Sequence, residues 1–273
     1  MQISDRSGRI LGTGHFGDRS IAVRLLSFDD SNINAVFYHE KLQNALDVRL
    51  SIGLPAVETD AFRLIHGEGD GLPGLIIDIY RKSAVVQTHS AGMSRDIDSI
   101  KEAISGITGL QIEETIHISA ETKSKGTWDN EKSEGSEFLE NGHLFYANWK
   151  DGQKTGFFID QRENRALLGS LSKGKKVLNA FSYTGGFSVY ALKAGASLVH
   201  SLDSSRGALD LGEKHLKMNG LSDSLHVSIQ ADALDFFSKG DVEDYDIIVL
   251  DPPAFAKHRS ARHRAVQAYK RLN

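Results

Sequence analysis

The spacing of apolar and polar residues changes along the chain and divides it into stretches with different expected secondary structure. Residues 1–30 combine short apolar runs with glycines, which predicts short strands. Residues 35–52 place apolar side chains near a helical period and are followed by Gly53, so a helix is predicted there. We therefore expect a β segment too small to bury a core by itself, followed by a helical linker over residues 31–60.

Residues 61–147 mix strand-like and helix-like patterns, which is typical of an α+β domain. Within it, the stretch 121–137 is charged and polar with few apolar residues, and it predicts a mobile loop. Two further strands are expected after the predicted helix of this domain. The other predicted elements are strands at residues 62–66, 75–80 and 84–88 and a helix at residues 94–105.

From Lys175 onward, apolar strands alternate with helical patterns and short connections. This alternation predicts an α/β fold with a parallel, doubly wound sheet. The predicted strands are residues 177–180, 198–202, 225–229 and 246–250. One predicted helix ends near residue 194, and a second spans residues 205–219.

The amino-acid composition excludes several classes of protein. Hydrophobic residues make up 40% of the chain and charged residues 25%, which excludes a wholly disordered protein. No apolar run reaches the about 18 residues of a membrane helix, and the N-terminus lacks the layout of a signal peptide. We therefore expect a cytoplasmic protein that has no membrane partner. The sequence contains 0 cysteines, which excludes disulfides, thiolate metal sites and a thiol nucleophile within these residues.

Glycines and aspartates follow the first three strands of the predicted parallel sheet, at the edge where such sheets bind ligands. Gly185 and Gly186 allow a ligand to approach the backbone closely. Asp203 can accept the hydroxyls of a ribose, and Asp232 can contact an adenine amino group. Each feature has a structural alternative, namely a tight turn for the glycines and a helix cap for either aspartate. Because they occur in order at three successive strands, together they predict a pocket for an adenosine-containing cofactor.

The residues that follow the fourth strand indicate which kind of ligand lies beside this pocket. The dinucleotide fingerprint Gly-x-Gly-x-x-Gly and a basic phosphate-binding loop are both absent from the sequence. Pro252 and Pro253 fix the backbone after Asp251, which leaves the preceding carbonyl free to accept a hydrogen bond from a planar base. Phe255 offers a face on which such a base can stack. The alternative is a proline-rich strand end followed by a core phenylalanine.

Four stretches of the sequence resemble motifs of the S-adenosylmethionine-dependent methyltransferases of large-subunit ribosomal RNA. They are residues 63–74, 151–165, 179–187 and 251–255. The resemblance implies an N-terminal PUA RNA-binding barrel, represented here in part by residues 1–30, and a central α+β domain over residues 61–147. It also implies a Rossmann-like methyltransferase domain over residues 148–273. The best-known member of the family methylates cytosine carbon 5 in 23S rRNA, and a sister branch methylates guanine N7.

The same resemblance assigns roles to individual residues. It implies that Asp203 takes the ribose hydroxyls of S-adenosylmethionine and that Asp232 takes the adenine. Asp251, Pro252 and Pro253 would face the methyl group and the incoming base, with Phe255 beside them. The methionine and ribose of the cofactor would be lined by Phe181, Ser182, Tyr183, Gly185 and Gly186, and its methionine end bordered by Thr155, Phe157, Asp160 and Gln161.

The chain departs from the family pattern at both ends. Family members continue past the fourth strand to further strands and to the cysteine used in cytosine-5 chemistry, whereas this sequence ends at Asn273 and begins inside the expected PUA barrel. We therefore expect a truncated form. Cytosine carbon 5 becomes nucleophilic only after a thiolate adds to carbon 6, and no thiolate is available here. Ala254 also stands where two-cysteine enzymes carry a second cysteine.

These observations leave several functions open. The leading prediction is a 23S rRNA cytosine-5 methyltransferase in its complete form. Guanine N7 or an exocyclic amine as target needs no cysteine, although Ala254 after the two prolines disfavours the amine. A noncatalytic RNA-binding protein that retains the cofactor fold is an alternative from another class, and a nicotinamide dehydrogenase is a more distant one.

A basic run follows the predicted base-binding motif. The net charge is −4, so RNA binding requires a local patch of this kind. The alternative is a solvated helix face. The expected partner is 23S rRNA, and a homodimer is left open. The residues predicted to hold RNA phosphates are Lys257, Arg259, Arg262 and Arg264.

Overall fold

The computed structural model describes residues 1–17, 21–119, 133–238, 244–256 and 262–272. The chain forms two compact units. Unit 1 consists of Met1–Gly142 and Tyr146–Ile159, and unit 2 consists of His143–Phe145 and Asp160–Asn273. The main segment of unit 2 thus begins at Asp160, whereas the sequence predicts a domain that starts at residue 148. Each unit is described by itself.

Unit 1 begins with a three-stranded antiparallel sheet in which β2 pairs with both neighbours. The strands predicted for residues 1–30 are therefore present. In the part of the chain that the structure describes they form an open sheet, and no closed barrel is found. The strands are β1 (Gln2–Ser4), β2 (Ile10–Phe16) and β3 (Val23–Ser27).

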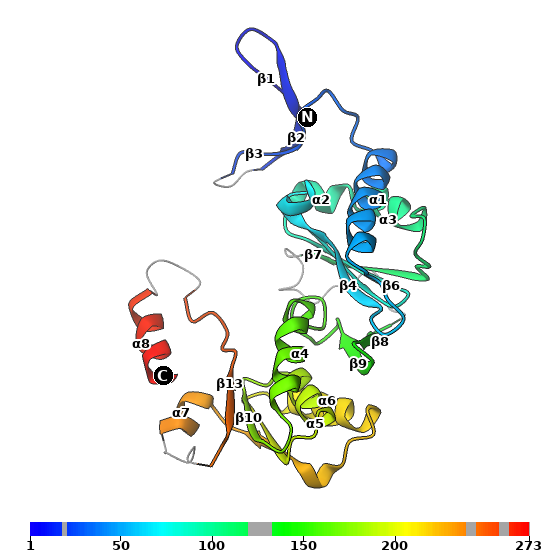
Figure 1. Cartoon of the computed structure of the whole chain (residues 1–273). Helices are drawn as coiled ribbons and strands as arrows, with labels where there is room; N and C mark the ends of the chain where they lie inside the picture. The colour runs from blue at the N-terminus through cyan, green and yellow to red at the C-terminus, as the bar shows by residue number, and fades with distance from the viewer. Residues whose placement is uncertain (18–20, 120–132, 239–243, 257–261, 273) are drawn as a thin grey trace. The chain divides into compact units, whose positions relative to one another are not determined.

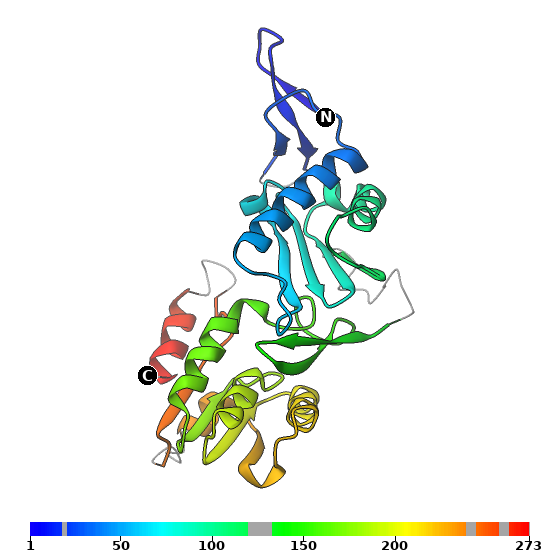
Figure 2. The same cartoon turned by 45° about the vertical axis from the view of Figure 1, so that its right-hand side comes forward.

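The core of unit 1 lies between a mixed four-stranded sheet and two helices. The sheet order is β4-β5-β6-β7, with β7 parallel to β6 and the other pairs antiparallel. Helices α1 and α3 pack on one face of this sheet, and their apolar residues share one buried cluster with β5 (Figure 2). The elements are α1 (Ala35–Ser51), β4 (Ala61–His66), β5 (Leu75–Tyr80), β6 (Ser83–Thr88), α2 (Ala91–Arg95), α3 (Ile97–Ser105) and β7 (Glu114–Ser119).

Two local expectations in unit 1 are wrong in detail. The helix predicted over residues 94–105 is two helices separated at Asp96, whose carboxylate accepts hydrogen bonds from Tyr38 (2.7 Å) and pairs with His15 (2.9 Å). The loop predicted over residues 121–137 lies mostly outside the described residues, but its last part belongs to strand β8 (Gly135–Glu140). Strand β8 pairs with β9 (His143–Asn148).

Unit 2 contains the predicted parallel, doubly wound sheet. Its described strands lie in the order β12-β11-β10-β13, and all pairs are parallel. Helices α5 and α6 cover one face, and α7 packs against the other face through a separate apolar cluster (Figure 1). The strands are β10 (Lys176–Ala180), β11 (Leu198–Asp203), β12 (His226–Gln230) and β13 (Ile247–Leu250). The helices are α4 (Arg162–Leu171), α5 (Gly186–Lys193), α6 (Arg206–Met218), α7 (Ala233–Ser238) and α8 (Arg262–Leu272).

Short 3-10 helices span Gly67–Asp70, Ile159–Gln161 and Asp223–Leu225. Among the described residues, no helix has the length and apolar character needed to cross a membrane.

The sheet of unit 2 brings the carboxyl ends of its strands to one edge, which is where the candidate site lies.

Candidate active site

The carboxyl ends of the parallel strands in unit 2 meet at one edge of the sheet. Ala180 at the end of β10 is in register with Leu202 of β11, and Asp203 is in register with Gln230 of β12. On the other side, Ala180 is in register with Leu250 of β13. The segments that follow these four strands therefore start side by side, as the sequence predicts.

The loop after β10 has an unusual backbone conformation. Phe181 (φ +56°) and Tyr183 (φ +46°) both lie in the left-handed region, which costs about 1–3 kcal/mol for each residue other than glycine. Gly185 (φ +70°) ends the loop, and a Cβ atom there would lie 3.2 Å from the Cα of Gly212 in α6. The loop is therefore pressed against α6, and only glycine fits at position 185 without strain.

Asp203 holds this loop in place. One carboxylate oxygen accepts a hydrogen bond from the Tyr183 amide (2.8 Å), and the other accepts one from the Ser205 amide (2.9 Å). Helix α6 is capped by Ser205, whose side chain accepts from the Ala208 amide. Each carboxylate oxygen of Asp203 has a second lone pair, and the side chain is partly exposed. Asp203 can therefore accept two ribose hydroxyls while it keeps its backbone bonds.

Asp232 behaves differently. Its Oδ1 atom accepts hydrogen bonds from the amides of Leu234 (2.8 Å) and Asp235 (3.1 Å), so the side chain caps the first turn of α7. The structural alternative considered for this residue is thus realised. Asp232 is exposed at the end of β12, and its role toward an adenine stays a prediction.

Ser182 provides the observation that speaks most directly for a ligand. It is 5% exposed, and its Oγ atom has no hydrogen-bond partner among the described residues. A buried polar atom without a partner costs about 1–3 kcal/mol, so such atoms in native proteins call for an explanation. Ser182 lines a small pocket together with Tyr183, Gly185, Ser188, Ser201, Leu209, Gly212, Leu216 and His226. A cofactor hydroxyl, amine or carboxylate at this loop would complete its hydrogen bonding.

The motif after β13 lies next to the same loop. The ring of Phe255 is 6.4 Å from that of Phe181 and 4.8 Å from that of Tyr269 in α8, both in edge-to-face geometry. Pro252 is half-buried, whereas Asp251 and Pro253 are exposed. Phe255 therefore joins the predicted base-binding segment to the loop predicted to hold the methyl donor.

Comparison with known proteins decides which family this geometry belongs to. The model of a family described as S-adenosylmethionine-dependent methyltransferase matches residues 116–273. The ribosomal RNA large subunit methyltransferase of Deinococcus radiodurans is 34% identical over 286 residues, which cover 99% of this chain and 70% of that protein. Ribosomal RNA large subunit methyltransferase I of Alteromonas mediterranea is 35% identical, covering 100% of this chain and 71% of that protein. The chain belongs to the S-adenosylmethionine-dependent ribosomal RNA large subunit methyltransferase family.

Solved structures agree with this family. A putative methyltransferase crystallised with SAH has a TM-score of 0.81 and 27% identity over 94% of this chain and 68% of its own. A putative S-adenosylmethionine-dependent methyltransferase from Streptococcus mutans has a TM-score of 0.81 and 26% identity over 98% of this chain and 73% of its own. This methyltransferase is therefore an enzyme with a Rossmann-like domain, and S-adenosylmethionine is its cofactor. The unpartnered Ser182 hydroxyl, the close-packed Gly185 and the Asp203 carboxylate fit that cofactor.

The other predicted cofactor residues of the methyltransferase divide between the two units. Thr155 and Phe157 belong to unit 1, where they are 0% and 2% exposed. Asp160 and Gln161 belong to unit 2, where Asp160 is exposed and Gln161 accepts a hydrogen bond from Asn164 (2.7 Å). Gly186 is the first residue of α5. The assignment of these residues to the cofactor stays a prediction.

The predicted RNA-binding run of the methyltransferase is described only in part. Lys257 and Arg259 lie outside the described residues, as does the side chain of Arg264. Arg262 is the first residue of α8 and is exposed. The helix that carries it also presents exposed Lys270 and Arg271 near its end. Contact of this run with phosphates stays a prediction.

Sequence reasoning missed a buried polar chain beneath the cofactor loop of the methyltransferase. Asn179 of β10 donates to Ser188 Oγ (2.9 Å), Ser188 bonds Ser201 of β11 (2.7 Å), and Ser201 bonds His226 Nε2 of β12 (2.8 Å). Ser188 lies in α5 and Ser201 in β11, and an isolated serine in a helix or strand pattern gives no signal of such pairing. Burial lowers the pKa of His226, and the neighbouring His200 adds to this effect, against the opposing charges of Glu213 and Asp223.

The lowered pKa of His226 predicts a loss of stability in acid. Below the ordinary histidine pKa of about 6.5, unfolded chains bind a proton that folded chains bind only at lower pH, so stability falls as the pH decreases through this range. We expect wild type to lose more melting temperature than His226→Gln between about pH 7.5 and about pH 5.5. Thermal denaturation of both proteins measures this, and equal losses would contradict it. Burial also lowers the pKa of His200. His200 is present in both proteins, so its own contribution to the loss of melting temperature drops out of the comparison.

Proposed function

We propose that this methyltransferase modifies a base of large-subunit ribosomal RNA. The observation that carries the proposal is the edge-to-face contact between Phe255 and Phe181, 6.4 Å apart, because it sets the fourth-strand motif beside the cofactor loop. A planar base held by Pro252, Pro253 and Phe255 would then lie next to the methyl group. The names of the relatives, which are ribosomal RNA large subunit methyltransferases, support RNA as the source of that base.

The chain's own residues would divide the work between holding the cofactor and holding the base. S-adenosylmethionine supplies an electrophilic methyl group when bound. Asp203 would orient it by accepting from its ribose, and Ser182 and Tyr183 would line its methionine part. Asp251 and the two prolines after it would present hydrogen-bond acceptors to the polar edge of the base.

Two further parts of the chain would bind RNA. The open sheet β1–β3 would represent part of a PUA-like barrel, as the resemblance of the sequence to the family implies. The basic run with Lys257, Arg259, Arg262 and Arg264 would hold phosphates next to the target base.

Two target atoms are distinguished by one property of the sequence. The first candidate target is cytosine carbon 5 in 23S rRNA, which we infer for the complete form of this protein. Methylation of this atom requires a thiolate to add to carbon 6. These 273 residues contain 0 cysteines, so that thiolate would have to come from outside them. Guanine N7 has its own lone pair and needs no thiolate, which makes it the second candidate.

The experiment that tests the proposal is mass spectrometry of ribosomal RNA from a strain that lacks the gene. We expect one methylated nucleotide of large-subunit rRNA to be absent from that strain and restored by a plasmid copy. The identity of the missing nucleotide distinguishes 5-methylcytosine from 7-methylguanine. An rRNA modification pattern equal to that of the parent strain would rule out ribosomal RNA as the substrate.

A second measurement tests the thiolate argument. The purified 273-residue chain, incubated with methyl-labelled S-adenosylmethionine and unmodified 23S rRNA, is expected to yield no 5-methylcytosine, because a covalent step through sulfur is not available to it. Binding of S-adenosylmethionine by calorimetry is the control for a folded cofactor site. Formation of 5-methylcytosine in the absence of other proteins would require a cysteine-free mechanism and would contradict this prediction.

A further inference from the structure

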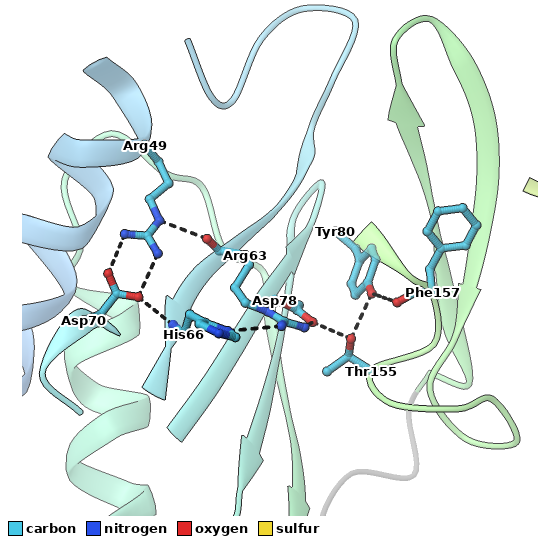
Figure 3. A network of polar contacts seen from close by, with 8 residues as sticks. All are labelled: Arg49, Arg63, His66, Asp70, Asp78, Tyr80, Thr155 and Phe157. Carbon is cyan, nitrogen blue, oxygen red and sulfur yellow. Dashed lines mark hydrogen bonds and ion pairs between the residues drawn. The ribbon is translucent and has the colours of Figure 1, made fainter. Parts of the chain in front are cut away.

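A line of hydrogen-bonded side chains runs through unit 1 and ends on the motif at residues 151–165 (Figure 3). Arg63 of β4 binds Asp78 of β5 in a bidentate ion pair, with Nε to Oδ1 at 2.7 Å and Nη2 to Oδ2 at 2.9 Å. The same Oδ2 accepts a hydrogen bond from Thr155 Oγ1 at 2.5 Å. The Tyr80 hydroxyl lies 3.0 Å from Thr155 Oγ1 and 3.4 Å from the Phe157 carbonyl oxygen.

The directions of these hydrogen bonds follow from the charge of Asp78. An ionised carboxylate only accepts hydrogen bonds, so the Thr155 hydroxyl donates its hydrogen bond to Asp78. The Thr155 oxygen is then an acceptor for Tyr80, which shares its single proton between Thr155 and the Phe157 carbonyl. Arg63 donates to both carboxylate oxygens of Asp78, and Oδ2 has a second lone pair that accepts from Thr155. The order of the network therefore depends on the negative charge of Asp78.

Burial makes this network rigid. Asp78, Tyr80 and Thr155 each have 0% exposure. Along β5, Ile77 and Ile79 belong to the apolar cluster under α1, so Asp78 and Tyr80 alternate onto the opposite face of the sheet. On that face the Tyr80 ring packs against Phe138 (5.2 Å) and Trp149 (6.3 Å). A buried network of charged and hydrogen-bonded groups tolerates little displacement of its members.

The held residues immediately precede the entry to unit 2. Thr155 and Phe157 are fixed by the network, and the 3-10 helix Ile159–Gln161 follows two residues later. Asp160 is the first residue of the main segment of unit 2, and α4 starts at Arg162. The backbone path from Thr155 to Asp160 is therefore anchored at its start by β5.

We propose that Asp78 is a positioning residue for the cofactor site, acting through Thr155 on the backbone of residues 155–161. The proposal rests on the proposed function and on the implication of the family resemblance that this segment would border the methionine end of S-adenosylmethionine. It also reassigns Thr155, because a hydroxyl that donates to Asp78 and accepts from Tyr80 is engaged inside unit 1. Thr155 then influences the cofactor through the conformation of the segment and not by direct contact.

A second ion pair in unit 1, joined to the first by a hydrogen bond from Arg49 Nε to the Arg63 carbonyl (3.0 Å), supplies a matched control (Figure 3). Arg49 binds Asp70 in the same bidentate way, at 2.6 Å and 2.7 Å, and Asp70 also accepts from the His66 amide (2.6 Å). Each of the two aspartates is thus bound by its own bidentate arginine and by one further donor. They differ in that the further donor of Asp78 is Thr155 of the 151–165 motif, whereas that of Asp70 lies at the end of its neighbouring strand β4.

The test compares Asp78→Asn, Thr155→Val and Tyr80→Phe with Asp70→Asn in the full chain. Calorimetry with S-adenosylmethionine and thermal denaturation are run on every variant. We expect the dissociation constant for the cofactor to rise about tenfold in Asp78→Asn and Thr155→Val and a few-fold in Tyr80→Phe. Asp70→Asn is expected to lower the melting temperature and to leave the cofactor dissociation constant unchanged.

The alternative is that the network only stabilises unit 1. In that case all four variants would lose melting temperature and keep the cofactor dissociation constant within about twofold of wild type, which would overturn the proposal. Thr155→Val keeps the shape of the side chain and the Arg63–Asp78 pair, so it gives an answer even where Asp78→Asn does not fold. Failure of the proposed function would appear instead as unchanged rRNA in the deletion strain, with wild-type cofactor binding intact.

Discussion

Asp203→Ala is expected to weaken the binding of S-adenosylmethionine by about 1–3 kcal/mol, which corresponds to a rise in Kd of roughly fivefold to 150-fold. Two effects add in this variant. The acceptors for the ribose hydroxyls are lost, and the Tyr183 amide loses the bond that holds it in a left-handed conformation. Calorimetric titration of the folded variant with the cofactor measures the change.

Ser205→Ala is the control for this experiment. It removes the cap of α6, the helix that follows Asp203, at a cost of about 1 kcal/mol of stability. It keeps the Asp203 carboxylate, so its cofactor affinity should equal that of wild type. An Asp203→Ala protein that is folded and binds the cofactor as tightly as Ser205→Ala would remove Asp203 from the site.

Gly156→Ala is expected to lower the free energy of unfolding by about 3 kcal/mol. Gly156 has φ +113°, and a Cβ atom there would lie 2.8–2.9 Å from backbone atoms of Asn148. Backbone atoms cannot move aside as a flexible side chain can, so both the conformation and the contact oppose a larger residue. Denaturant unfolding of wild type and variant measures the difference.

Gly174→Ala separates the two causes. Gly174 has φ +70°, and no atom lies within 4 Å of the position its Cβ would occupy. The substitution there costs only backbone strain, about 1 kcal/mol. Equal losses of stability in the two variants would mean that the approach of Asn148 contributes nothing at position 156.

The period of the apolar residues predicts all four parallel strands of unit 2 to within one residue at each end. This succeeds because each strand is a short continuous apolar run bounded by turn residues, which is a local property of the sequence. The helix predicted over residues 94–105 fails for the opposite reason. It divides at Asp96 where the partners of the carboxylate, His15 and Tyr38, lie far away in the sequence.

The candidate site follows the same rule. Strand order and glycine position predict where Gly185 and Asp203 lie, because the carboxyl ends of parallel strands meet at one edge of a sheet. Whether an aspartate at such an edge caps a helix depends on local backbone geometry, and only the structure separates Asp203 from Asp232. Asp78 gave no signal because its partners Arg63 and Thr155 come together only through the pairing of β4 with β5 and the return of a later segment.

The left-handed residues of the cofactor loop have a thermodynamic consequence. Phe181 and Tyr183 owe their conformation to bonds with the next strand, since the Ser182 amide donates to the Leu202 carbonyl (3.0 Å) and the Tyr183 amide to Asp203. The loop is thus ordered when the sheet forms and before any ligand arrives. Its conformational entropy is lost in folding and not in binding, so the protein exchanges part of its own stability for affinity toward the cofactor.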